Sequence, residues 1–183
     1  CMCPGGFVVN SSSEYGYLSI NGMSYSKRDS NISNSAIIVT VNNKDFGEGP
    51  LDGIKYQENL EKKAYSLGNG KILVQTFKDY KNNVYNPKDL LNLKIKGNYT
   101  YANINEVFPD YINTSLKEAI TYSGKKIKGF DDDNVIIAAV ESKTSSPVKF
   151  IRNENMESNI KGLYPIGEGS GYAGGIQQVL LRE

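Results

Sequence analysis

The chain contains no histidine. This absence excludes several common kinds of catalysis, because Ser-His-Asp and Cys-His sites both use an imidazole as the base. It also excludes histidine metal ligation and histidine proton transfer near neutral pH. No general acid or base can be named from the residues; tyrosine, glutamate or lysine would have to serve, or a residue outside this chain.

Cysteine is almost as scarce, and long apolar runs are missing. The two thiols, Cys1 and Cys3, cannot by themselves form a structural zinc site or a disulfide scaffold. No apolar run approaches the roughly 18 residues that a membrane span needs, and we expect no secretory signal. We therefore expect a cytoplasmic protein in a reducing compartment, with no metal and no membrane partner.

The charge is balanced, so neither sign dominates. The chain has 21 basic and 20 acidic side chains dispersed along 183 residues, which gives a formal net charge of +1. A chain with this balance lacks the excess of positive charge that typically binds nucleic acid. We expect no nucleic-acid partner.

Apolar periodicity predicts an α+β fold, with mixed and antiparallel strands and several helices. Asn21-Gly22 is a hairpin-turn signal, and Pro109 interrupts a helical pair in which Thr114 would cap the second helix. A helix is expected over Leu51–Leu67, with Gly68 as its C-terminal cap. The expected strands are Phe7–Asn10, Tyr15–Ile20, Ala36–Val41, Ile72–Phe77, Asn134–Ser142 and, more weakly, Ser145–Arg152.

The segment Gly162–Ile176, GLYPIGEGSGYAGGI, holds six glycines around a lone carboxylate, Glu168. Its G-x-G-x-x-G match is a weak dinucleotide signal, because no βαβ unit with a later acidic residue can follow it here. We interpret Leu163–Ile166 as a strand that delivers Glu168 to a ligand rich in hydroxyls, with a helix beginning near Tyr172 whose amides face that ligand. The alternative is a flexible loop that binds nothing.

Several segments in order resemble a family of bacterial and archaeal FAD-dependent dehydrogenases, relatives of the glutathione-reductase-like flavoproteins. The resemblance rests on CMCPGGFVVNSSSEYGYLSINGMSYSKRD, NSAIIVTV, PLDGIKYQENLEKKAYSLGNG, VESKTSSPVKFIR and GLYPIGEGSGYAGGI. It implies an insertion or substrate-cap domain over residues 1–160, whose edges 1–9 and 142–160 can belong with the FAD domain. Residues 161–183 would be the C-terminal strand-loop segment of a split FAD-binding domain.

The same resemblance implies a parent oxidoreductase that binds FAD and a small-molecule substrate, with NAD(P)H as a further candidate partner. The N-terminal Rossmann unit is absent from this chain, so we expect the chain alone to be inactive and to hold no FAD. The implied cofactor-binding residues are Gly167, Glu168, Gly169, Ser170, Gly171, Tyr172, Ala173, Gly174, Gly175 and Ile176.

Other readings stay open at this point. Cys1 and Cys3 are weak catalytic candidates, either as a redox thiol pair near the flavin or, for Cys1, as an N-terminal nucleophile of an amidohydrolase that needs no histidine. The hydroxyls of Thr144–Ser146 could approach the cofactor, although a turn before Pro147 is favoured. Asp131–Asp133 lacks calcium-loop spacing and is expected to be a solvated turn. A non-catalytic interaction domain is a further alternative.

Overall fold

The computed structural model describes residues 5–87 and 93–173. By its internal contacts the chain divides into two compact units, of which the first comprises residues 1–40 and 58–142 and the second residues 41–57 and 143–183. Strands and helices are mixed, so the predicted α+β class is confirmed. Among the described residues, no helix is long and apolar enough to cross a membrane.

The first unit is built around a three-stranded sheet in the order β4-β3-β5. The central strand β3 (Ile72–Thr76) runs parallel to β4 (Tyr99–Tyr101) and antiparallel to β5 (Ile136–Ala139). All five residues of β3 are buried, which explains its unbroken apolar start: a strand covered on both faces does not alternate with polar residues. The predicted strands over Ile72–Phe77 and Asn134–Ser142 are confirmed in their central parts.

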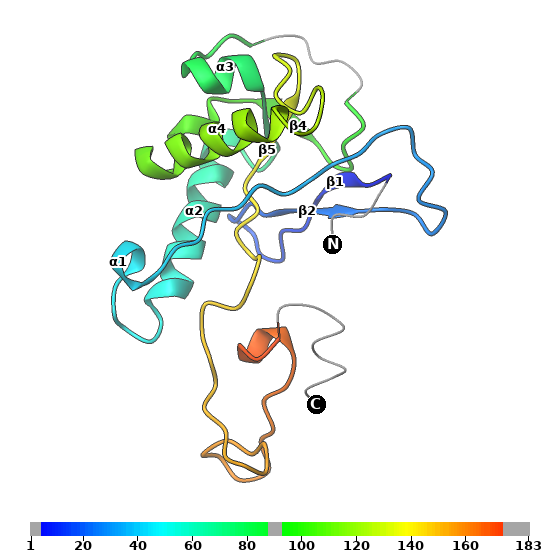
Figure 1. The fold of residues 1–183 in the computed structure, drawn as a ribbon. Helices are drawn as coiled ribbons and strands as arrows, with labels where there is room; N and C mark the ends of the chain where they lie inside the picture. Colours follow the sequence, from blue (N-terminus) through cyan, green and yellow to red (C-terminus); the bar gives the residue numbers. More distant parts are fainter. Residues whose placement is uncertain (1–4, 88–92, 174–183) are drawn as a thin grey trace. The chain divides into compact units, whose positions relative to one another are not determined.

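Hydrophobic residues pack on both faces of this sheet. Leu73 belongs to the larger cluster, together with residues of α2 (Asp52–Gly68), α3 (Phe77–Asn82), η1 (Ile104–Glu106) and α4 (Asp110–Gly124). Ile72 and Val74 point to the opposite face and pack with Ile20, as the alternation of side chains along a strand requires. Figure 1 shows α3 and α4 beside β4 and β5.

A second sheet in this unit pairs β1 (Phe7–Asn10) with β2 (Ile20–Met23), antiparallel. The prediction of a turn at Asn21-Gly22 is wrong, because both residues lie inside β2 and pair with Val9 and Val8. The chain reverses earlier, over residues 11–19, where the amide of Ser11 donates to the oxygen of Ser19. The hydroxyl of Ser12, which bonds the backbone N–H and the backbone oxygen of Ser19, closes this loop in place of the expected two-residue turn.

Two further local predictions are corrected by tertiary context. Ala36–Val41 has no ladder partner within the described part of the chain and is irregular, with Ile38 58% exposed; an apolar run without a neighbouring strand does not form a sheet. Thr114 lies inside α4 rather than at its start, since Pro109 holds the extended N-cap conformation and helix begins at Asp110. The helix predicted over Leu51–Leu67 is confirmed as α2, one residue later at each end.

Up to residue 173, where the described part of the second unit ends, its own helices are the short α1 (Asn43–Phe46) and η2 (Glu168–Ser170), besides residues 52–57 of α2. The strands predicted over Leu163–Ile166 and Ser145–Arg152 are absent: the described residues of these ranges show one isolated bridge, Arg152 with Ser158. Both hydrophobic clusters belong to the first unit. The second unit is therefore held together mainly by polar and backbone contacts.

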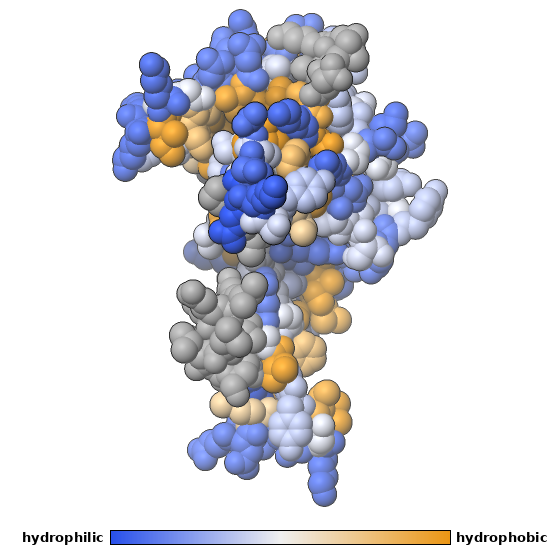
Figure 2. All heavy atoms as spheres, turned by 90° about the vertical axis from the view of Figure 1, so that its right-hand side faces the viewer, coloured by the Kyte–Doolittle hydropathy of each residue, from blue (hydrophilic) through white to orange (hydrophobic). Residues whose placement is uncertain are grey.

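Residues 150–166 of the second unit expose an unusual amount of apolar side chain. Hydrophobic residues are visible at the molecular surface in Figure 2. The large apolar side chains that are more than 40% exposed in this range are Phe150, Ile151, Met156, Ile160, Leu163, Tyr164 and Ile166. Exposed apolar side chains are thus concentrated in this stretch of the second unit.

Candidate functional site

The described part of the glycine-rich segment, residues 162–173, forms a tight turn that no strand precedes. Gly167 and Gly171 flank η2 with φ values of 77° and 82°. This left-handed conformation is one that glycine adopts without a Cβ collision. Ser170 closes the turn, because its hydroxyl donates to the oxygen of Gly167 at 2.8 Å and is nearly buried.

Residues 146–150 lie directly against this turn. The amide of Phe150 donates to the oxygen of Ser170 at 3.0 Å, and the hydroxyl of Ser146 donates to the oxygen of Gly169 at 3.1 Å. A β-carbon on Gly171 would come within 2.5 Å of the oxygen of Val148. The structure thus brings the Thr144–Pro147 segment and the glycine segment together, although more than 20 residues separate Ser146 from Gly169 along the chain.

A hollow of about 270 Å³ lies between these two segments. Polar side chains such as Glu168 and Ser145 line it together with Pro147, and apolar surface makes up the larger share of the lining. The lining residues are Gln57, Lys143, Ser145, Ser146, Pro147, Glu168 and Gly169. A carboxylate, hydroxyls and bare backbone around one small space suit a ligand that carries hydroxyl groups.

Gly167 and Gly169 differ from Gly171 in what surrounds them. A β-carbon at either position would meet no atom of the described residues within 4 Å. The positive φ of Gly167 explains why a glycine stands there. Gly169 has no positive φ, so its backbone conformation does not require glycine. None of the described residues fills the space in front of Gly169, so a ligand can approach its backbone closely.

Cationic side chains gather at Tyr172, the residue that follows the turn. The guanidinium carbon of Arg152 lies 3.7 Å from the centre of the Tyr172 ring, and the ammonium of Lys149 lies 4.6 Å from it. Arg152 also donates to the oxygen of Pro165 at 2.8 Å, which fixes the approach to the turn. Both contacts are cation–π geometry, and they leave the side of the turn near Tyr172 positive.

The other predicted site residues fall into three groups. Gly174, Gly175, Ile176, Cys1 and Cys3 lie outside the described residues. Tyr172 and Ala173 are described and are not helical, and the rest of the predicted final helix lies beyond them. Asp131–Asp133 forms a turn, with Asp133 3.5 Å from the ammonium of Lys78. The described part of the chain holds no cluster of three potential metal ligands.

A second polar pocket, in the first unit, was not predicted from the sequence. It also measures about 270 Å³ and is lined by Asn83, Asn103, Asn105, Glu106, Asp110, Asn113, Thr114 and Lys117. Four of these residues follow the spacing i, i+3, i+4, i+7 along α4, which places them on one face of the helix. The sequence contains that spacing, but a helix capped by Thr114 would have left Asp110 and Asn113 outside it.

Comparison with known proteins defines the class. Residues 1–144 match a family described as "FAD-dependent protein, C-terminal domain-like". The chain belongs to this family, and the resemblance to FAD-dependent proteins is confirmed at that level. The match ends before the glycine-rich segment.

A relative in Clostridium beijerinckii, described as an uncharacterized protein, is 44% identical over 187 aligned positions. The alignment covers 96% of this chain but only 34% of that relative. The chain therefore spans about a third of the length of the curated relative it matches.

Proposed function

We propose that the chain forms part of an FAD-dependent oxidoreductase, in which it covers the flavin and shapes the substrate site. Membership of a family of C-terminal domains of FAD-dependent proteins supports the cofactor. The threefold greater length of the relative supports a further part of the protein that holds most of the FAD. When bound, FAD supplies the hydride chemistry, and this chain supplies binding and orientation.

The observation that carries the proposal is the open backbone at Gly169 beside Glu168 and the serines. A glycine with no positive φ and no crowded neighbour is explained if a ligand packs against its backbone. Glu168 can accept hydrogen bonds from ribityl or ribose hydroxyls, and Ser145 offers a further hydroxyl at the rim. These residues fit the hydroxyl-bearing middle of FAD.

The size of the hollow limits how much of the cofactor it can take. Small-molecule sites usually enclose about 300–1,000 Å³, and 270 Å³ falls just below that range for a cofactor that is itself large. The hollow therefore suits a portion of FAD, and the remainder would lie on the other part of the protein. Tyr172, with Arg152 and Lys149 on its ring, would face the anionic pyrophosphate side, which the positive charge of the two cations would favour.

The exposed apolar residues of 150–166 support the same arrangement. The second unit has no hydrophobic cluster of its own among the described residues, yet it exposes Ile151 at 86% and Ile166 at 61%. Burying such side chains stabilises an association by about 25 cal/mol for each Å² removed from water. A neighbouring domain of the same protein would cover them.

Two measurements test the proposal. The reading frame upstream of Cys1 should encode a glycine-rich Rossmann fingerprint, and an upstream region without a nucleotide-binding half would overturn the assignment. In the full-length protein, Glu168→Gln should weaken FAD retention about tenfold, because one charge-assisted hydrogen bond is lost. Glu154→Gln, an exposed carboxylate in the same unit, is the matched control and should retain FAD.

The substitution Gly169→Ala tests independently whether FAD packs against this backbone. The added methyl group would meet no described atom in the chain itself, so stability without FAD should not change. If FAD packs against this backbone, the same substitution should reduce FAD retention in the full-length protein. Equal FAD content in wild type and Gly169→Ala would show that the ligand does not contact this turn.

A further inference from the structure

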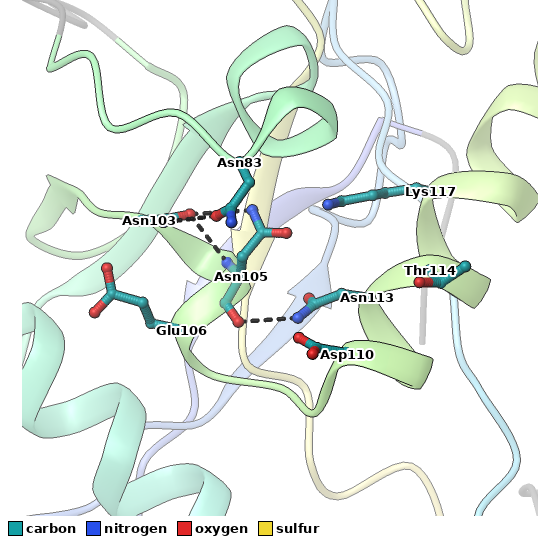
Figure 3. Close-up of a pocket in the computed structure, with 8 residues that line it drawn as sticks. All are labelled: Asn83, Asn103, Asn105, Glu106, Asp110, Asn113, Thr114 and Lys117. Carbon is teal, nitrogen blue, oxygen red and sulfur yellow. Dashed lines mark hydrogen bonds between the residues drawn. The ribbon is translucent and has the colours of Figure 1, made fainter.

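The polar pocket of the first unit has two rigid walls. One is the face of α4 with Asp110, Asn113, Thr114 and Lys117, and the other is formed by Asn83, Asn103 and Asn105 (Figure 3). Asn83 caps the end of α3 in a left-handed conformation, and Asn103 caps the start of η1. The pocket is therefore built from the ends of three helices.

Carboxamide hydrogen bonds lock the asparagines in place. The side-chain nitrogen of Asn103 donates to the side-chain oxygen of Asn83 at 2.9 Å. The side-chain nitrogen of Asn105 donates to the side-chain oxygen of Asn103 at 3.0 Å and to the backbone oxygen of Tyr80 at 2.9 Å. The side-chain nitrogen of Asn113, a residue that is 4% exposed, donates to the backbone oxygens of Asn105 and Phe108. The walls are thus ordered before any ligand arrives, which lowers the entropic cost of binding.

Lys117 brings an ammonium with unused donors into this pocket. Its nitrogen lies 5.1 Å from the centre of the Tyr80 ring, and no described residue accepts a hydrogen bond or ion pair from it. Figure 3 shows Lys117 extending from α4 toward Asn105 and Asn83. Burial lowers the pKa of Lys117, against the opposing effect of Asp110. A partly desolvated ammonium of this kind favours an anionic partner.

Asp110 supplies the opposite charge, two helical turns away along the same face of α4. No ion pair joins it to Lys117, so the two charged groups stay separated across the pocket. Glu106 adds a second carboxylate at the rim and points away from Lys117 in Figure 3. The pocket therefore has a positive end and a negative end, with carboxamides between them.

We propose that this pocket binds a small zwitterion of the amino-acid class, with its carboxylate on Lys117 and its ammonium on Asp110. The separated charges match a molecule that carries both signs, and the carboxamides and Thr114 provide neutral hydrogen-bonding groups along its length. A volume of about 270 Å³ accommodates a molecule of this size. The proposal is independent of the flavin, since it rests on residues of the first unit alone.

The test is an NMR titration of the isotope-labelled chain with β-alanine, γ-aminobutyrate and ε-aminocaproate, which place the two charges at increasing separation. Butyrate and butylamine, matched in ionic strength, carry one charge each. We expect at least one zwitterion to shift the amides of residues 103–106 and 110–117 saturably, and to bind more tightly than either singly charged compound. Equal binding of a singly charged compound, or no saturable shift with any zwitterion, would overturn the proposal.

Variants assign the two ends of the pocket. Lys117→Met and Asp110→Asn should each weaken the zwitterion about tenfold, the size expected for one charge-assisted hydrogen bond. Lys125→Met and Glu118→Gln alter exposed charges at or near the same helix and should leave the affinity unchanged. Thermal unfolding verifies that each variant is folded. If the control variants lost as much affinity for the zwitterion, the effect would come from the overall charge of the chain, and the assigned contacts with Lys117 and Asp110 would be contradicted.

Discussion

The phenol of Tyr80 donates a hydrogen bond of 2.9 Å to the side-chain oxygen of Asn113, and both residues are buried. This bond joins α3 to α4 beneath the polar pocket. Because the nitrogen of Asn113 is itself fixed by two backbone oxygens, Tyr80 links the hydrophobic cluster to the pocket wall. The same side chain packs in the core and orders the polar face above it.

Tyr80→Phe should lower the free energy of unfolding by about 1–3 kcal/mol, because the oxygen of Asn113 would be left buried without its donor. Chemical denaturation of the 183-residue chain measures this loss. Tyr122→Phe is the matched control, since Tyr122 is 57% exposed and its hydroxyl reaches water. A Tyr80→Phe protein as stable as wild type would show that water satisfies Asn113 in its place.

Alkaline pH should destabilise the chain through its buried tyrosines. Burial raises the pKa of Tyr80, and burial together with the hydrogen bond to Asp79 raises the pKa of Tyr101. In the unfolded chain both titrate near about 10. Between that value and the higher folded pKa the folded state holds more protons, so stability is complete below about pH 10 and falls as the pH rises.

The Tyr80→Phe variant measures how much of this loss of stability at alkaline pH comes from Tyr80. Above about pH 10 its unfolding free energy should fall less steeply than that of wild type, by up to about 1.4 kcal/mol per pH unit. Denaturation curves from about pH 8 to about pH 11 give both slopes. Parallel slopes would mean that Tyr80 ionises as easily in the folded state as in the unfolded one.

The parts of the fold that could be predicted are those whose signals are local and strong. The apolar run of β3 and the periodicity of α2 predicted these elements to within a residue or so, because burial on the sheet and along one helix face leaves a direct mark on the sequence. The turn predicted at Asn21-Gly22 was wrong because a turn signal depends only on neighbouring residues. The pairing of β2 with β1 depends on residues that lie further away along the chain.

The candidate site was predictable in composition but not in arrangement. The glycines and Glu168 indicated a ligand-binding backbone, yet the strand expected before them is absent. The contact of Ser146 with Gly169 depends on tertiary folding that no spacing reveals. The sequence did not predict the pocket on α4 for a related reason: Pro109, rather than Thr114, is the N-cap of the helix, and only then do Asp110 and Lys117 fall on one face.

Gly171→Ala should disrupt the glycine turn more than Gly162→Ala does. Both glycines have φ near +80°, so each alanine costs about 1–2 kcal/mol in the left-handed conformation. At Gly162 the added carbon meets nothing within 4 Å of the described residues, whereas at Gly171 it would lie 2.5 Å from the oxygen of Val148. Gly171→Ala should therefore also break the bond from the amide of Phe150 to Ser170.

Hydrogen exchange of the Phe150 amide reads out this difference. Its protection should fall clearly in Gly171→Ala and remain near the wild-type level in Gly162→Ala. The pair separates the cost of the backbone conformation, which both variants share, from the cost of the collision, which only one has. Similar protection in the two variants would mean that residues 146–150 do not rest on this turn.

The 183-residue chain alone should retain no FAD. Mixed with excess FAD and then desalted, it should show no flavin absorbance, because a hollow of about 270 Å³ has room for only a portion of the cofactor. The full-length Clostridium beijerinckii relative, treated in the same way, is the comparison protein and should retain flavin if its additional length carries the other contacts. Stoichiometric flavin on the short chain would contradict the division of the site between two parts of the protein. It would also place a complete FAD site within these 183 residues.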